Sequence, residues 1–203
     1  WMPKRRIEVA FRRALLNVAK GVVAHAEKAS DPAAISVALE RLTQAPDFIR
    51  LSEAIAMKMV TGLFDDTGRT WREAARNNSR GKDIYQALQK ELLGGRGGCV
   101  RELVKENAAL IKTLPKNIAD DVTAYAAREA MKGRRASDIA DEIRRMFPER
   151  TRARAGLIAR TQVSMTQTNL VQARAEGLGL NCIFGELVAG SRVTAERETA
   201  IGA

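Results

Sequence analysis

The sequence predicts a mostly α-helical protein, with a multi-helix elongated or bundled body and a small mixed α/β end at the C-terminus. Composition is the first reason. Hydrophobic residues make up 45% of the 203 residues but aromatic residues only 4%, and the frequent Ala, Arg, Leu and Glu favour helices. The second reason is periodicity, because apolar residues recur at three- and four-residue steps along most of the chain. The third is the change after residue 176, where repeated glycines and short apolar runs indicate strand pieces or a poorly ordered terminus.

Three helices are predicted near the N-terminus. The first is expected over residues 4–29, where apolar residues form one stripe at helical spacing. That stripe consists of Ile7, Phe11, Leu15, Val18 and Val22. The second helix begins at Asp31-Pro32, because Asp can cap a helix and proline suits its first turn. Pro46 begins the third, which we expect to end near Gly62.

Local turn signals predict how the chain continues. The Asp-Asp-Thr-Gly run at 65–68 is typical of a turn. Thr70 and Glu73 have the spacing of a capping box and predict the start of a short helix. After Gly81, apolar spacing predicts another helix over 82–93.

The strongest break in the sequence is the segment 94–98, which has four glycines in five residues. It fits neither a P-loop nor a dinucleotide-binding motif, so a flexible connection is the better interpretation than a phosphate-binding loop. We therefore predict an N-terminal helical region over 1–93, a Gly-rich linker, a second helical region over 99–180, and a tail over 181–203 that forms strands or is disordered.

Prolines and glycines divide the second region into helices. They are expected over 99–112, 116–132, 137–147 and 151–175. Pro115 is predicted to separate the first two, and Pro148 to end the third, because proline removes a backbone donor and clashes with the preceding turn.

The charge balance favours an anionic partner. The chain has 34 Lys and Arg against 24 Asp and Glu, a formal charge of +10, which suits nucleic acid, an acidic protein or a membrane surface. A basic but ordinary solvated surface is an equally good interpretation of the same numbers.

The sequence carries no mark of a catalytic, metal or cofactor site. Cys99 and Cys182 are far apart, and His25 is the single histidine, so a zinc site has no plausible ligand set. No nucleophile motif accompanies His25, which is expected to be structural. No apolar run approaches the roughly 18 residues that a membrane span needs, so we expect no catalytic residues, no metal, no cofactor and no membrane partner.

The last predicted helix contains an unusual run. Residues 161–169 carry no charge in a chain that is 29% charged. Gln162, Thr166 and Asn169 share one helical face. Such a seam is typical of burial against another segment, either as a polar network between helices or as a subunit interface. The sequence leaves both interpretations open.

Residues in this helix resemble the phage head morphogenesis family, the Mu F-like minor head proteins of tailed phages and prophages. The matching residues are Ile158, Ala159, Arg160, Thr161, Gln162, Asn169 and Gly177. Gln162 stands where the family usually has Glu, and the match extends over about residues 150–180. After this motif, the family pattern continues with Asp-x-Arg-Val. The counterpart here is Gly190-Ser191-Arg192-Val193, which has Gly in place of Asp. For that reason no metal-binding or catalytic role is transferred from the family to this part of the chain.

The resemblance implies a non-catalytic structural and assembly role in the virion, at or inside the portal vertex of the head, with the host cytoplasm as the place of assembly. It implies the portal protein and other capsid proteins as partners, and several copies or a homo-oligomer in the assembly. It is also compatible with non-specific contact to the phosphate backbone of double-stranded DNA.

Basic residues suitable for contact with DNA or with an acidic portal surface are concentrated just before the motif. They are Arg134, Arg135, Arg144, Arg145, Arg150, Arg152 and Arg154. Ion pairs with nearby acids along the helix are the alternative interpretation. The other function that charge alone supports is a stand-alone basic helical protein that binds nucleic acid, although no reader motif is present.

Overall fold

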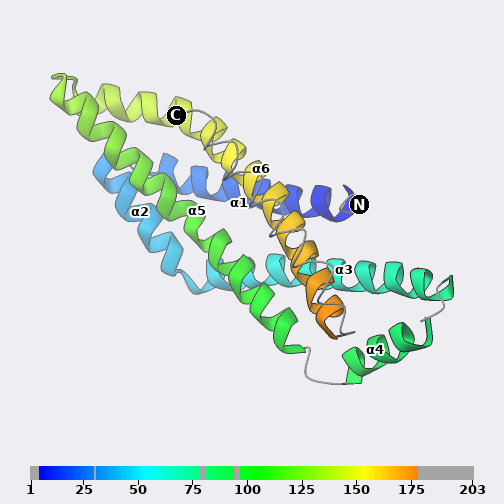
Figure 1. Cartoon of the computed structure of the whole chain (residues 1–203). Helices are drawn as coiled ribbons and strands as arrows, with labels where there is room; N and C mark the ends of the chain where they lie inside the picture. Colours follow the sequence, from blue (N-terminus) through cyan, green and yellow to red (C-terminus); the bar gives the residue numbers. More distant parts are fainter. Residues whose placement is uncertain (1–4, 30, 78–80, 94–96, 178–203) are drawn as a thin grey trace, which may run out of the picture.

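The computed structural model describes residues 5–29, 31–77, 81–93 and 97–177, which form six helices and no strand (Figure 1). The helices are α1 (Arg5–Glu27), α2 (Pro32–Gln44), α3 (Pro46–Arg76), α4 (Gly81–Leu93), α5 (Gly97–Met131) and α6 (Ala136–Gly177). The predicted mostly helical fold is confirmed. The predicted α/β end and the 181–203 tail lie outside the described residues. So do residues 94–96 of the predicted linker, whereas Gly97 and Gly98 already belong to α5.

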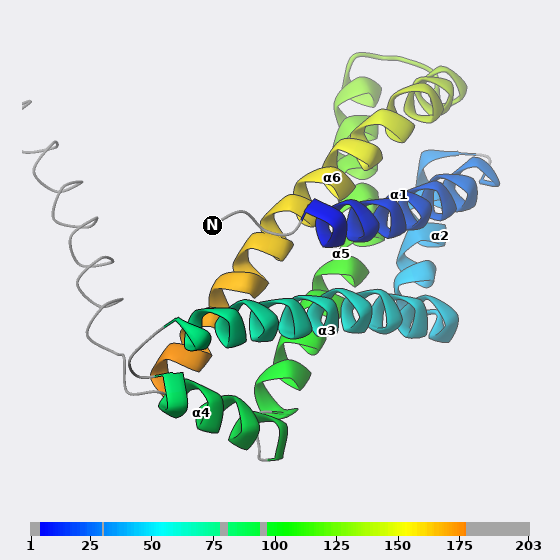
Figure 2. The same ribbon diagram turned by 90° about the vertical axis from the view of Figure 1, so that its right-hand side faces the viewer.

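The helices are arranged in crossing pairs (Figure 2). α1 and α3 lie side by side, and the antiparallel pair α5 and α6 crosses them, while α2 lies along α5 and α4 packs against α3. Helices from both halves of the sequence therefore share one hydrophobic core. Its fully buried side chains include Leu15 and Ile35 from the first half, and Ile111, Ile143 and Val163 from the second.

The first two helices follow the local signals of the sequence. Four of the five predicted stripe residues of α1 are buried, and Ile7 packs at the edge of the core. At the start of α2, the Asp31 side chain accepts a hydrogen bond from the backbone N–H of Ala34 at 2.9 Å. Pro32 occupies the first turn, where its missing N–H costs nothing.

The predicted turn at 65–68 is wrong, because α3 continues through it to Arg76. The threonine hydroxyl groups on which the predicted turn and cap depended donate hydrogen bonds to carbonyls one turn earlier in the helix. Thr67 Oγ1 donates to the Leu63 carbonyl at 2.8 Å, and Thr70 Oγ1 donates to the Asp66 carbonyl at 3.2 Å. Burial of Leu63 and Thr67 keeps this stretch helical. The separate short helix expected after the turn is therefore the end of α3.

The two predicted proline boundaries are also wrong. Pro115 lies inside α5 and Pro148 inside α6. Each proline costs the helix about 3 kcal/mol, but the buried stripe continues on both sides of it. Around Pro115 the buried residues are Ile111, Leu114, Ile118 and Val122, and around Pro148 they are Ile143, Phe147, Thr151 and Ala155. Ending either helix would remove the second half of that stripe from the core, which is the larger loss.

The turn between α5 and α6 lies in the gap between the helices expected over 116–132 and 137–147. Gly133 has a φ of 77°, a left-handed conformation that glycine adopts without strain. Its N–H donates to the Ala130 carbonyl at 2.9 Å, and the Arg134 N–H donates to the Glu129 carbonyl at 3.2 Å. These bonds close α5 and direct the chain into α6.

Candidate functional site

α6 carries the predicted motif and most of the predicted basic residues, and its buried stripe explains how it is held. Seven buried residues follow one another at four-residue steps, from Ile139 to Val163. Four residues turn a helix by about 40° more than one full turn, so the stripe winds around α6. α6 therefore contacts α1, α3 and α5 along its length.

The family-like motif is divided between packing and solvent. Ala159 is fully buried and Ile158 packs at the edge of the core. Arg160, Thr161 and Asn169 are exposed. Gln162 is half-buried, with its Nε2 3.9 Å from the sulfur of Met165, and Gly177 is the exposed last residue of α6. The structure thus does not gather the motif residues into one pocket.

The uncharged run 161–169 has a buried face and an exposed face. Its buried face holds Val163 and Thr166, and the Nδ2 of the buried Asn107 in α5 donates to Thr166 Oγ1 at 3.1 Å. That contact is a polar link between helices. Its outer face is exposed and uncharged, and includes Met165, which is 52% exposed.

Three of the seven predicted contact arginines are tied to other parts of the protein. Arg134 pairs with Glu129 at 3.0 Å and with Glu142 at 2.5 Å. Arg144 pairs with Asp141 and also donates to the carbonyl of Ala29, two residues after the end of α1. The third, Arg154, lies 3.5 Å from a carboxylate oxygen of Asp121 in α5.

The other four, Arg135, Arg145, Arg150 and Arg152, are exposed and form no ion pair with any residue that the structure describes. Arg145 and Arg152 are seven residues apart and so lie in one row of the helix. Arg152 also borders a hollow of about 240 Å³ between α1 and α6, together with Lys20. Among the predicted residues, these four are the ones available to an anionic partner.

The group formed by Tyr125, Glu129, Arg134 and Glu142 closes the α5–α6 turn, and we call it the hairpin clasp. Hydrogen bonds from Lys132 and then from Arg134 lower the pKa of Glu129 below its usual value. Those from Arg134 and then from Tyr125 lower the pKa of Glu142. Burial, followed by the hydrogen bond to Glu142, raises the pKa of Tyr125. These shifts all favour the charged carboxylates and the neutral phenol, as expected for a structural clasp.

The sequence analysis missed Arg174, which is only 3% exposed. Its guanidinium group donates to the Phe64 carbonyl at 3.0 Å and to Thr67 Oγ1, and lies 4.7 Å from the centre of the Phe64 ring. A signal existed: Arg174 comes four residues after Leu170 and extends the buried stripe of α6. The arginine joins the end of α6 to α3, and we call this group the Arg174 anchor.

Gly68 of α3 explains how the anchor fits. A Cβ at this position would lie 3.3 Å from Nη2 of Arg174, closer than an ordinary contact. The glycine therefore permits close approach of the guanidinium, and it does not mark a turn.

The structure offers no metal or membrane-spanning feature in the residues it describes. No three His, Cys, Asp or Glu side chains there are grouped so as to hold a metal ion. His25 is exposed, with its Nδ1 2.9 Å from the carbonyl oxygen of Gly21 on its own helix. Cys99 is half-buried, and Cys182 lies outside the described ranges. Within those ranges, no helix has the length and apolar character required to cross a bilayer.

Comparison with known protein families, with curated proteins and with solved structures finds no match to this chain.

Proposed function

We propose that this chain is a minor head protein of a tailed phage or prophage, with a non-catalytic role in head assembly at the portal vertex. The observation that carries the proposal is the motif-like run at 158–177, which resembles that family. α6 supports it physically, because the same helix that carries the run also presents exposed arginines.

The proposed partners follow from this arrangement. Arg145 and Arg152 lie in one row, and Arg135 and Arg150 are also exposed. Arginines of this kind bind phosphate oxygens without reading the base sequence. The same groups suit an acidic face of a portal or capsid protein. The one aromatic residue among them in the sequence is Phe147, which is buried in the core. Its ring is therefore not presented for stacking on single strands.

The proposal is tested by asking whether the protein travels with particles. Phage heads from a lysate that contains this chain would be separated by density and their proteins identified. We expect retention with the portal protein at low copy number. Absence from intact heads, with all of the protein free in the lysate, would contradict the proposal.

A stand-alone nucleic-acid-binding protein is the second candidate, favoured by the charge of +10 and the exposed arginines. The two candidates differ in how binding responds to salt and to sequence. Tight binding to one DNA sequence at high salt favours the second candidate, whereas binding that is lost steeply with salt on any sequence fits a head protein in contact with packaged DNA.

A further inference from the structure

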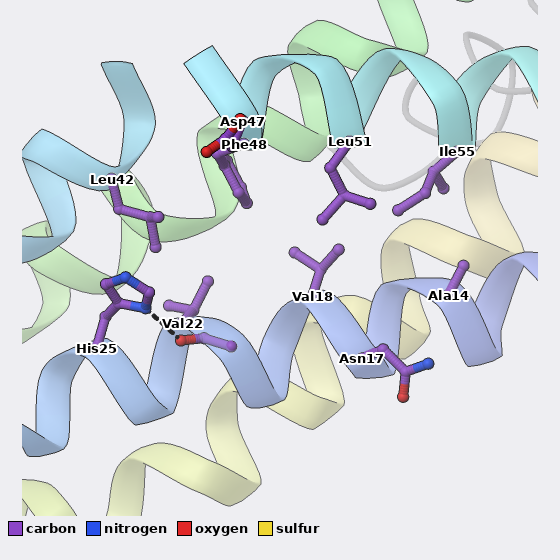
Figure 3. A pocket seen from close by; sticks show the side chains of 11 residues that line it. Ala14, Asn17, Val18, Val22, His25, Leu42, Asp47, Phe48, Leu51 and Ile55 are labelled. Carbon is purple, nitrogen blue, oxygen red and sulfur yellow. Dashed lines mark hydrogen bonds between the residues drawn. The ribbon is translucent and has the colours of Figure 1, made fainter. Parts of the chain in front are cut away.

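An apolar groove runs between α1 and α3. Two neighbouring hollows, of about 410 and 460 Å³, lie along these helices and share Ala14 and Ile55 in their lining. Figure 3 shows the first of them, with Val18 of α1 facing Leu51 and Ile55 of α3 across the space. The groove is therefore an apolar strip on one face of the molecule.

Small residues keep this groove open. α1 contributes Ala10, Ala14 and Gly21, and α3 contributes Ala54 and Gly62. A Cβ added to Gly21 would meet nothing within 4 Å. Since these positions leave the space unfilled, the groove fits apolar side chains that come from another helix.

α6 presents a row of side chains suited to such a groove. The row, which we call the α6 ridge, consists of Leu157, Thr161, Ser164, Met165 and Thr168. All are exposed, with Leu157 at 64% and Met165 at 52%. None carries a charge, and their spacing of three, four and eight residues is that of an amphipathic helix that docks into a groove.

The ridge does not fill the groove of its own chain, because its side chains are exposed while the groove is open. A second copy supplies both parts. The chain carries +10, so copies repel one another in general. Contact through an uncharged ridge and an apolar groove avoids most of that repulsion.

Charges at the ends favour one direction of docking. Arg6 and Lys58 lie at one end of the groove, and Asp47, which pairs with Arg50 of its own helix at 2.6 Å, lies at the other. On α6, Arg160 lies among the first residues of the ridge, and Glu176 lies beyond its last residue. At a helical rise of 1.5 Å per residue these two are about 24 Å apart, and Asp47 and Lys58 on α3 are about 16.5 Å apart. The side chains span the difference.

We propose that the α6 ridge of one copy packs into the α1–α3 groove of a second copy. Arg160 then lies towards Asp47 of the second copy, and Glu176 lies towards its Arg6 and Lys58. The two surfaces are different, so the contact is head-to-tail and leaves a free groove on one copy and a free ridge on the other. Repetition builds a ring or an open chain of copies. The inference stands on these two surfaces and does not depend on the proposed function.

Two variants of the full chain each disrupt one of the two proposed contact surfaces. The ridge variant is Leu157→Glu with Met165→Glu, and the groove variant is Ala10→Glu with Leu51→Glu; all four positions are exposed. Met57→Glu is the matched control, because Met57 is 47% exposed and belongs to neither surface. Circular dichroism and thermal unfolding establish that each variant is folded.

Sedimentation velocity over a range of protein concentrations measures the oligomeric state of each variant. We expect wild type and Met57→Glu to associate beyond dimers as concentration rises, and each double variant to stay monomeric. A mixture of the two variants retains one intact ridge and one intact groove, so it should form a 1:1 dimer and nothing larger. A monomeric wild type, association of the groove variant alone, or a mixture without dimers would each overturn the proposal.

Discussion

Two arginines hold the ends of α6, and they do so in different surroundings. Arg134 in the hairpin clasp is 37% exposed in its side chain and pairs with two carboxylates. Arg174 in the anchor is 3% exposed and bonds to a backbone carbonyl, a hydroxyl group and a ring face. Water competes for the first arginine and is excluded from the second, so removing the first should cost little stability and removing the second should cost more.

The difference also separates structure from function. Composition alone makes every arginine of α6 a candidate for an anionic partner. Packing assigns Arg174 to the core and Arg134 to the clasp, and leaves Arg145 and Arg152 free of ion pairs to the described residues. The following predictions probe that assignment, beginning with the largest expected effect.

Arg174→Ala should be the most damaging single change. It removes the donors to the Phe64 carbonyl and to Thr67 Oγ1 and leaves space in the core. We expect a loss of about 2 kcal/mol in the free energy of unfolding, from the lost hydrogen bonds and the space left behind. Urea unfolding followed by circular dichroism measures it. Arg160→Ala, an exposed arginine of the same helix, is the control and should stay within about 0.5 kcal/mol of wild type; equal effects would contradict the anchor.

Gly68→Ala tests how closely the anchor is packed. The new Cβ presses on the guanidinium of Arg174, which its hydrogen bonds hold in place, so the substitution should destabilise wild type. In an Arg174→Ala background the same substitution should stabilise the protein, by about 1 kcal/mol from helix propensity. A double-mutant cycle should therefore show a coupling of about 1–2 kcal/mol. Gly21→Ala, with open space around it, should stabilise the protein in both backgrounds, and additive effects of Gly68→Ala and Arg174→Ala would contradict the close contact.

Thr166→Val should have a smaller effect. It removes the hydroxyl that accepts from Asn107, which keeps its 2.7 Å bond to the Leu103 carbonyl. We expect a loss of about 1 kcal/mol in the free energy of unfolding. Thr161→Val, on the exposed face of the same helix, is the control, and a loss as large as that of Thr166→Val would argue against the polar link.

The hairpin clasp should make the stability of the folded protein depend on pH in the acid range. The pKa values of Glu129 and Glu142 lie below the ordinary 4.5 in the folded protein. Their contribution is therefore present above about pH 4.5, and it is lost as pH falls through the lowered values. Arg134→Gln should lower the melting temperature slightly at neutral pH and converge with wild type in acid. Arg135→Gln is the matched control, and an Arg134→Gln curve parallel to wild type at every pH would contradict the clasp.

Local signals predicted the parts of the fold that local chemistry decides. The Asp31 cap, the proline at the start of α2 and the turn at Gly133 depend on residues within one helical turn. The boundaries expected at Pro115 and Pro148 failed because burial of residues on both sides outweighs a local cost of about 3 kcal/mol. The turn expected at 65–68 failed because Leu63 and Thr67 are buried in the helical conformation. That burial depends on helices far away in the sequence.

The candidate site shows the same limit. Sequence reasoning identified α6 as the helix that carries information and named the four exposed arginines. It did not distinguish them from Arg154, whose partner Asp121 is 33 residues away. Arg174 went unnoticed because its partners lie more than 100 residues earlier in the chain.

The sorting of the arginines is tested most directly by DNA binding at several salt concentrations. Two double variants remove the same charge: Arg145→Gln with Arg152→Gln, and Arg134→Gln with Arg144→Gln. On duplex DNA of arbitrary sequence, the first pair should reduce the slope of log affinity against log salt by about two, one for each lost phosphate contact. The second pair should keep the wild-type slope while remaining folded. Equal reductions in both would show that net charge alone governs binding, and would contradict the assignment of the exposed arginines as the contact surface.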